Sequence, residues 1–205
     1  MGRSTKKALR VVELFILGVF FGLVPIAAVF MVAVLFASIA FGKESLGPWI
    51  LWFLLPGVFI DVLFLKKWVR NAYIMSAKTI GAMYVFYSVC AIGFFMGIPV
   101  GNILLGVFAG IYAGRKASVN NQVQTADYFK KTAFFTSAVM VLICCLMTLL
   151  AIVGDMIGYE VEVPISFTLT VPLFWTVVFT GGALLVLLQY WLTRITAKVT
   201  FSLKN

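Results

Sequence analysis

Residues able to do acid–base or metal chemistry are few in this chain and lie far apart. The 205 residues include seven Asp or Glu, three Cys and no His. Without His, imidazole cannot serve as a general base or as a ligand for haem or zinc. All three cysteines, Cys90, Cys144 and Cys145, lie inside apolar runs, so we expect them to serve as small, buried apolar residues. We therefore expect a noncatalytic protein with no catalytic residue, no bound metal and no cofactor.

Three polar side chains within apolar runs are candidate ligand or gate residues. Asp61 is either an interfacial carboxylate paired with a basic residue such as Lys78, or a gate or partner-contact residue. Asn102 follows a Gly–Pro turn, so it either caps the next helix or contacts a ligand at the external mouth. Gln189 lies near the end of the last apolar run, where a hydrogen bond between helices is the default expectation.

Glycines at helical spacing are candidate packing positions. Gly106, Gly110 and Gly114 repeat every four residues, and Gly18 and Gly22 repeat this spacing more weakly. Small residues on one helix face let another helix approach closely, because packing must drive helix association in lipid. The spacing predicts a helix contact. The alternative is a smooth wall along which a ligand or a lipid tail fits.

The elements that position these residues are predicted to be membrane-spanning helices. The chain is 63% hydrophobic and 11% charged, against about 45–50% and about 25% in soluble domains. As one helix, the uncharged run 79–114 would be about 54 Å long, so it must fold back as a hairpin in a bilayer core of about 30 Å. We predict an all-α bundle, a single transmembrane domain over 1–205, with spans at 14–41, 48–65, 79–96, 100–114, 132–153 and 171–192.

The basic residues set the predicted orientation. Fifteen of the sixteen Lys and Arg residues fall on one side of these spans, and only Lys43 falls on the other. The positive-inside rule therefore places both termini in the cytoplasm and the chain in the plasma (inner) membrane. The net charge of +9 does not indicate nucleic-acid binding, because the basic clusters flank apolar runs and form no stripe.

Three segments depart from a simple helical pattern. Residues 161–170 and 195–204 alternate apolar and polar side chains, which is typical of a strand. They are either extended interfacial segments (or, for the tail, a frayed helix end), or the tail adds an edge strand to a membrane or cytoplasmic protein partner. Gly181 and Gly182, near the middle of the last run, are a candidate hinge or packing notch.

These features leave two functional hypotheses open. The first is a noncatalytic subunit or accessory component of a membrane (transport) complex, which fits the glycine face and the strand-like tail. The second is a small stand-alone permease or substrate-binding membrane protein for a neutral or apolar solute. It predicts a site among spans three, four and six, lined by Asn102 or Gln189. A lipid-modifying enzyme is disfavoured, because such an enzyme usually needs clustered carboxylates, His or metal ligands near the headgroups, and carboxylates such as Asp61 and Asp127 form no cluster in the sequence.

Overall fold

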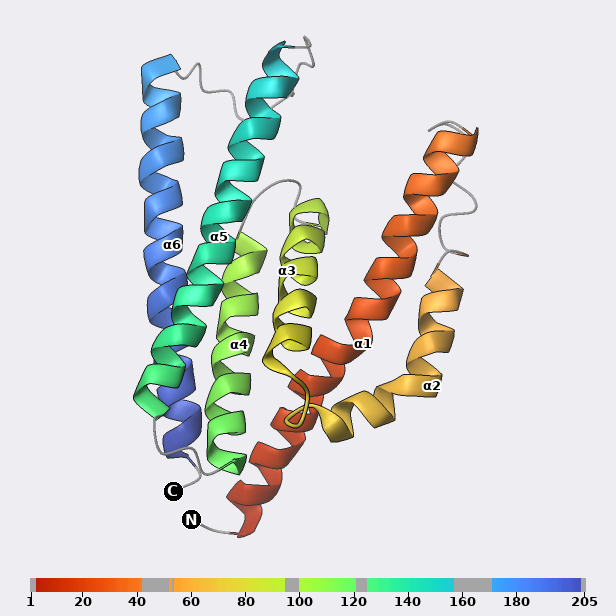
Figure 1. Cartoon of the computed structure of the whole chain (residues 1–205), viewed down its shortest axis with the longest axis vertical. Coiled ribbons are helices and arrows are strands. Elements are labelled where there is room, and N and C mark those ends of the chain that lie inside the picture. Colours follow the sequence, from red (N-terminus) through yellow and green to blue (C-terminus); the bar gives the residue numbers. More distant parts are fainter. Residues whose placement is uncertain are drawn as a thin grey trace. The chain divides into compact units, whose positions relative to one another are not determined.

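The chain folds into α-helices throughout the part that the structure describes. This computed structural model describes residues 3–41, 52, 54–94, 100–120, 125–156 and 171–203. Within these ranges there are six α-helices and no strand, so the all-α prediction is confirmed there. The helices, in chain order, are α1 (Arg3–Phe41), α2 (Leu55–Asn71), α3 (Ala77–Phe94), α4 (Val100–Val119), α5 (Thr125–Met156) and α6 (Val171–Ser202) (Figure 1).

The helices extend beyond the predicted spans. The prediction counted uncharged residues, whereas a helix keeps its backbone hydrogen bonds after it enters the polar flank. Helix α2 thus continues past Leu65 to Asn71, and Pro56 lies in its first turn, where the missing N–H breaks no helical hydrogen bond. Helix α4 begins at Val100, where the fourth predicted span begins, and residues 95–99 before it lie outside the described residues. Residues 48–51 and 53 of the second predicted span lie outside the described residues.

The strand prediction for the tail is wrong over residues 195–202. Helix α6 continues to Ser202, and Ala197 is fully buried in a cluster that Phe201 packs against. Ala197 and Phe201 are four residues apart, so they share one helix face. A short alternating run contains this spacing too, which is why period two misled the prediction. Residues 161–170, the other alternating segment, lie outside the described residues.

The chain divides into two compact units, Met1–Met83 and Tyr84–Asn205, with the boundary inside α3. In the first unit, α1 packs against α2. In the second, α4 and α6 share the most extensive contact, and α5 packs against both (Figure 1). Helices α4 and α6 run parallel, because Gly106 lies against Gln189 and Gly114 lies against Ala197.

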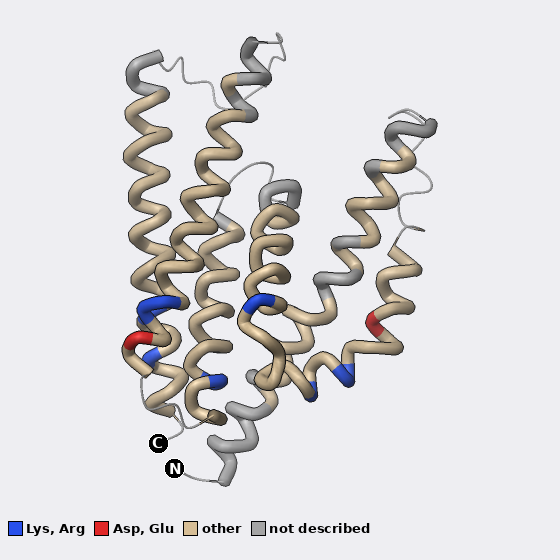
Figure 2. Tube along the Cα trace, in the orientation of Figure 1, with Lys and Arg blue, Asp and Glu red and all other residues tan. Residues whose placement is uncertain are grey.

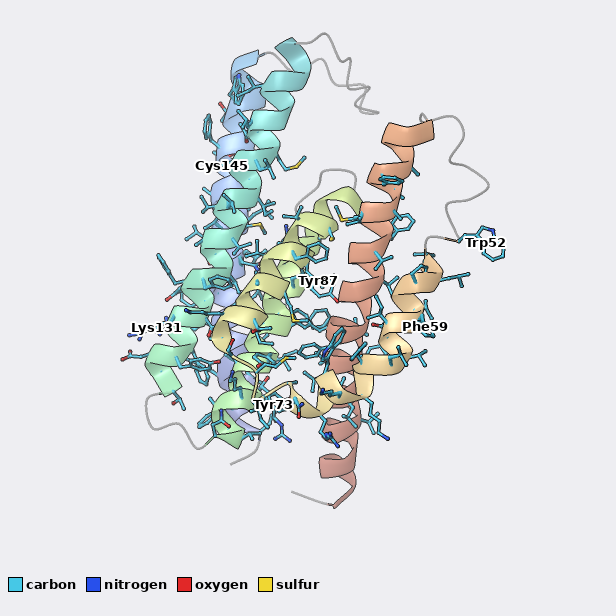
Figure 3. The ribbon with its side chains drawn as sticks, turned by 45° about the vertical axis from the view of Figure 1, so that its right-hand side comes forward. Trp52, Phe59, Tyr73, Tyr87, Lys131 and Cys145 are labelled. Carbon is cyan, nitrogen blue, oxygen red and sulfur yellow. The ribbon has the colours of Figure 1, made fainter. Side chains whose placement is uncertain are left out.

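Two of the described helices are long and apolar enough to cross a membrane. They contain the stretches Thr125–Leu149 and Trp175–Ser202, and only 11% of the most apolar part of the second is buried. A core helix of a soluble protein would be mostly buried, so this exposure favours a membrane helix. Large apolar side chains such as Trp52 and Phe59 are also exposed and point away from the helices (Figure 3). Two such helices are a weak indication of a membrane protein, and the other predicted spans stay predictions.

Candidate functional site

The glycine face of α4 lies directly against α6. A Cβ atom added at Gly110 would overlap the carbonyl oxygen of Thr193, and one added at Gly114 would overlap that of Ala197. Backbone therefore touches backbone at these turns, as the four-residue glycine spacing predicts. Because α6 covers Gly110 and Gly114, this helix face is not open to a ligand or a lipid tail at these two turns.

Gln189 of α6 occupies the space that Gly106 leaves open. Its side chain is fully buried, and an added Cβ at Gly106 would overlap its amide group. The amide nitrogen of Gln189 donates a hydrogen bond of 2.8 Å to the hydroxyl of Tyr84 on α3. The interhelical bond expected of Gln189 is therefore present. The amide oxygen of Gln189 is buried and has no hydrogen-bond partner.

Thr193, one turn after Gln189, joins three helices. Its hydroxyl donates to the carbonyl oxygen of Gly106 on α4 at 3.1 Å and lies 3.0 Å from the hydroxyl of Thr136 on α5. The Thr136 hydroxyl also donates a hydrogen bond of 3.0 Å to the carbonyl oxygen of Ala133 in its own helix. Two hydroxyl protons serve these three contacts, so the donors must be shared among them. Both threonines are buried, which makes this the polar connection of α4, α5 and α6.

Asn102 lies one turn before Gly106 on the same face of α4. Its side chain is 2% exposed, and neither its amide oxygen nor its amide nitrogen has a hydrogen-bond partner. The capping interpretation is wrong, because α4 begins at Val100 and Asn102 is already inside the helix. An unpaired buried amide costs about 1–3 kcal/mol in proteins. Such a group therefore requires an explanation.

Asp61 of α2 is the buried acidic side chain among the residues of the first unit that the structure describes. It is 8% exposed, and its Oδ1 atom has no hydrogen-bond partner. The predicted pair with Lys78 is wrong, because Lys78 is exposed and no ion pair joins the two in the described part of the chain. Asp61 instead faces α1, where a Cβ added at Gly22 would lie 3.1 Å from its Oδ2 atom. A Cβ added at Gly18 would meet nothing within 4 Å.

The remaining candidate positions form no chemical cluster. Among the residues that the structure describes, no three His, Cys, Asp or Glu side chains come together. Cys90 is buried and Cys145 is exposed, and neither is in a disulfide. The packing-notch interpretation of Gly181 and Gly182 is wrong, because a Cβ added at either meets nothing within 4 Å.

Sequence reasoning did not identify Thr193, Thr136 or Tyr84 as parts of this site. Thr193 had one available signal, since it lies four residues after Gln189 and so shares its helix face. For Tyr84 and Thr136 the sequence contains no such signal, because the spacing of residues within one helix does not reveal which residue of another helix they contact. The structure brings Gln189 and Gly106 together and places Asn102 on the same face, whereas Asp61 belongs to the other unit.

Comparison with known proteins adds no relative from which a function could be inferred. No protein-family model, no curated protein and no solved structure matches this chain.

Proposed function

We propose that the chain is a noncatalytic polytopic membrane protein that binds a small neutral polar solute in its second unit. Its six helices span the plasma (inner) membrane, with both termini in the cytoplasm. Asn102 and Gln189 hold the solute through their amide groups. The observation that carries the proposal is the buried side chain of Asn102, whose donor and acceptor are both unpaired.

The charge distribution of the second unit supports the membrane orientation. The described basic residues of α4, α5 and α6 gather at one end of these helices (Figure 2). They are the residues at the end of α4, the beginning of α5 and the end of α6: Arg115, Lys116, Lys130, Lys131, Arg194 and Lys198. Clustering at one end is what the positive-inside rule requires of a bundle with that end in the cytoplasm.

The chemistry of the buried groups supports a neutral solute. The fully or nearly fully buried polar side chains described in the second unit are all uncharged: Ser88, Asn102, Ser118, Thr136, Ser137, Gln189 and Thr193. An ion would need an opposite charge or several oriented dipoles to replace its hydration. A hydroxyl or amide of a neutral solute needs only a donor and an acceptor, which Asn102 supplies together.

The described residues support a role as a subunit of a transport complex less than they support solute binding. It rested on the glycine face of α4 and on the 195–204 tail. The glycine face is covered by α6, and the tail is helical to Ser202 with Ala197 packed inside the unit. Neither feature now requires a partner protein, so we place solute binding first.

Thermal unfolding of the purified protein in lipid nanodiscs, with a panel of polyols, amides and sugars, tests the proposal. A solute present at 100 times its Kd adds about 2.7 kcal/mol to the free energy of unfolding. We expect at least one solute to raise the midpoint for the wild type and for Asn120→Leu, whose side chain is exposed, and not for Asn102→Leu. If no solute acts, or if Asn102→Leu responds as the wild type does, the solute site is not at Asn102.

A further inference from the structure

Among the side chains that the structure describes, none forms an ion pair with the carboxyl group of Asp61, and its Oδ1 atom has no hydrogen-bond partner. Leu65, the residue one turn after Asp61, contacts the same glycine of α1, with its Cδ1 atom 3.6 Å from a Cβ added at Gly22. The basic residues nearest to Asp61 along α2 are Lys66 and Lys67, and both are exposed. They lie about 140° and about 240° around the helix from Asp61, on other faces.

Helix α1 has no titratable residue near Gly22 in its sequence. It is the helix that packs against α2 in the first unit, and it contains no acidic, basic, Cys or Tyr residue between Leu14 and Phe41. Glu13 is nine residues before Gly22, about 13 Å along the helix. Farther along α2, Arg70 is also exposed, and it lies on the face opposite Asp61. The carboxyl group therefore meets glycine and leucine instead of a cation.

We propose that Asp61 is a reversible proton-binding site between α1 and α2. An unpaired carboxylate in an apolar contact is strongly disfavoured, whereas a neutral carboxylic acid needs only modest hydrogen bonding. The carboxyl group carries a proton while Asp61 faces Gly22, and it gives the proton to water at higher pH. This site lies in the first unit and does not depend on the proposed solute site in the second.

A hydrophobic carbodiimide reports such a carboxyl group directly. In dicyclohexylcarbodiimide, the central carbon is attacked by the carboxyl oxygen while the acid proton moves to a nitrogen. The O-acylisourea then rearranges to a stable N-acylurea without loss of atoms. The protein in liposomes is treated at pH values between about 5 and about 9, all above the pKa of about 4 that an ordinary carboxyl group has. The adduct is then located by peptide mass spectrometry.

We expect one adduct, on Asp61, whose yield falls at least about tenfold across this pH range, in line with the decreasing protonated fraction. Asp127, the exposed carboxyl group in the first turn of α5, is the internal control. It should react with a water-soluble carbodiimide and an amine, and Asp61 should not. An unlabelled Asp61, a yield that does not change with pH, or equal labelling of Asp61 by the water-soluble reagent would overturn the proposal.

Variants of α1 test the contact with Gly22. Gly22→Leu should displace the carboxyl group and reduce the Asp61 adduct at least about fivefold, because even a Cβ there is within 3.1 Å of Oδ2. Gly18→Leu is the matched control, since a Cβ at Gly18 meets nothing within 4 Å. Asp61→Asn should give no adduct. Equal labelling in the two glycine variants would show that α1 does not enclose the carboxyl group.

Discussion

At the scale of single residues, the second unit contains buried polar groups that are paired and others that are not. The hydroxyl of Ser88 donates to the carbonyl oxygen of Tyr84 at 2.9 Å, within its own helix. Thr193 and Thr136 are paired between helices. Asn102 has no partner for either amide atom, and Gln189 has none for its oxygen. The fold retains each unpaired group at a cost of about 1–3 kcal/mol, and a bound solute would supply the missing hydrogen bonds.

The hydrogen bond between Gln189 and Tyr84 can be measured by removing its acceptor. Tyr84→Phe leaves the amide nitrogen of Gln189 buried without a partner, so the free energy of unfolding should fall by about 1–3 kcal/mol. Tyr84→Phe combined with Gln189→Leu should recover part of this loss, because no polar group is then left unpaired. Tyr190→Phe is the control. Denaturant unfolding in detergent gives the values, and equal effects of the two Tyr variants would contradict the hydrogen bond.

Thr193 should contribute more to stability than a threonine bonded only within its helix. Thr193→Val removes the hydroxyl that reaches Gly106 and Thr136, and we expect a loss of about 1–2 kcal/mol. Thr180→Val is the isosteric control, because the Thr180 hydroxyl is exposed and bonds the carbonyl of Thr176 in the same helix at 2.6 Å. Thermal unfolding of both variants in nanodiscs makes the comparison. A Thr193→Val midpoint equal to that of Thr180→Val would rule out the three-helix connection.

At the scale of helices, sequence identified a face but not its partner. The four-residue spacing of Gly106, Gly110 and Gly114 predicted a close helix contact, and the structure supplies α6 as the other helix. Small residues leave room without specifying what fills it, so the spacing alone could not name Gln189. The same ambiguity explains the error at Gly181, where a glycine in a membrane-type helix faces no neighbour within 4 Å.

The contact between α4 and α6 predicts opposite effects for two glycine variants. Gly110→Ala places a methyl group against the backbone of α6, and we expect a loss of about 1–3 kcal/mol from overpacking. Gly181→Ala meets nothing within 4 Å, so alanine should be neutral or should stabilise the helix by up to about 1 kcal/mol.

Unfolding midpoints in one detergent compare the two variants directly. Loss of stability in both, or in neither, would argue against the packed face. Size-exclusion chromatography of the same samples also shows whether Gly110→Ala alters oligomeric size, which this intramolecular contact does not require.

At the scale of the whole molecule, fold class was accessible from sequence and tertiary partners were not. Apolar runs separated by basic clusters indicated helices, and the described residues are all helical or in short turns. The strand prediction for the tail was wrong because its ten residues fit both the two-residue alternation of a strand and the four-residue repeat of a helix. Only the packing of Ala197 decides between these two patterns. The prediction of an Asp61–Lys78 pair failed because the two residues lie on different helices, and Asp61 faces Gly22 of α1 while Lys78 is exposed.

The proposed membrane protein has the basic end of its second unit in the cytoplasm and the opposite end outside the cell. A variant in which Cys90, Cys144 and Cys145 are replaced by Ala carries one new cysteine, either at the exposed position Lys131 of α5 or at Glu160 in the connection before α6. A membrane-impermeant maleimide is then added to intact cells and to permeabilised cells. We predict that Glu160→Cys reacts in intact cells and that Lys131→Cys reacts only after permeabilisation. Reaction of both cysteines in intact cells, or of Lys131→Cys alone, would contradict the membrane-spanning bundle with its basic end in the cytoplasm.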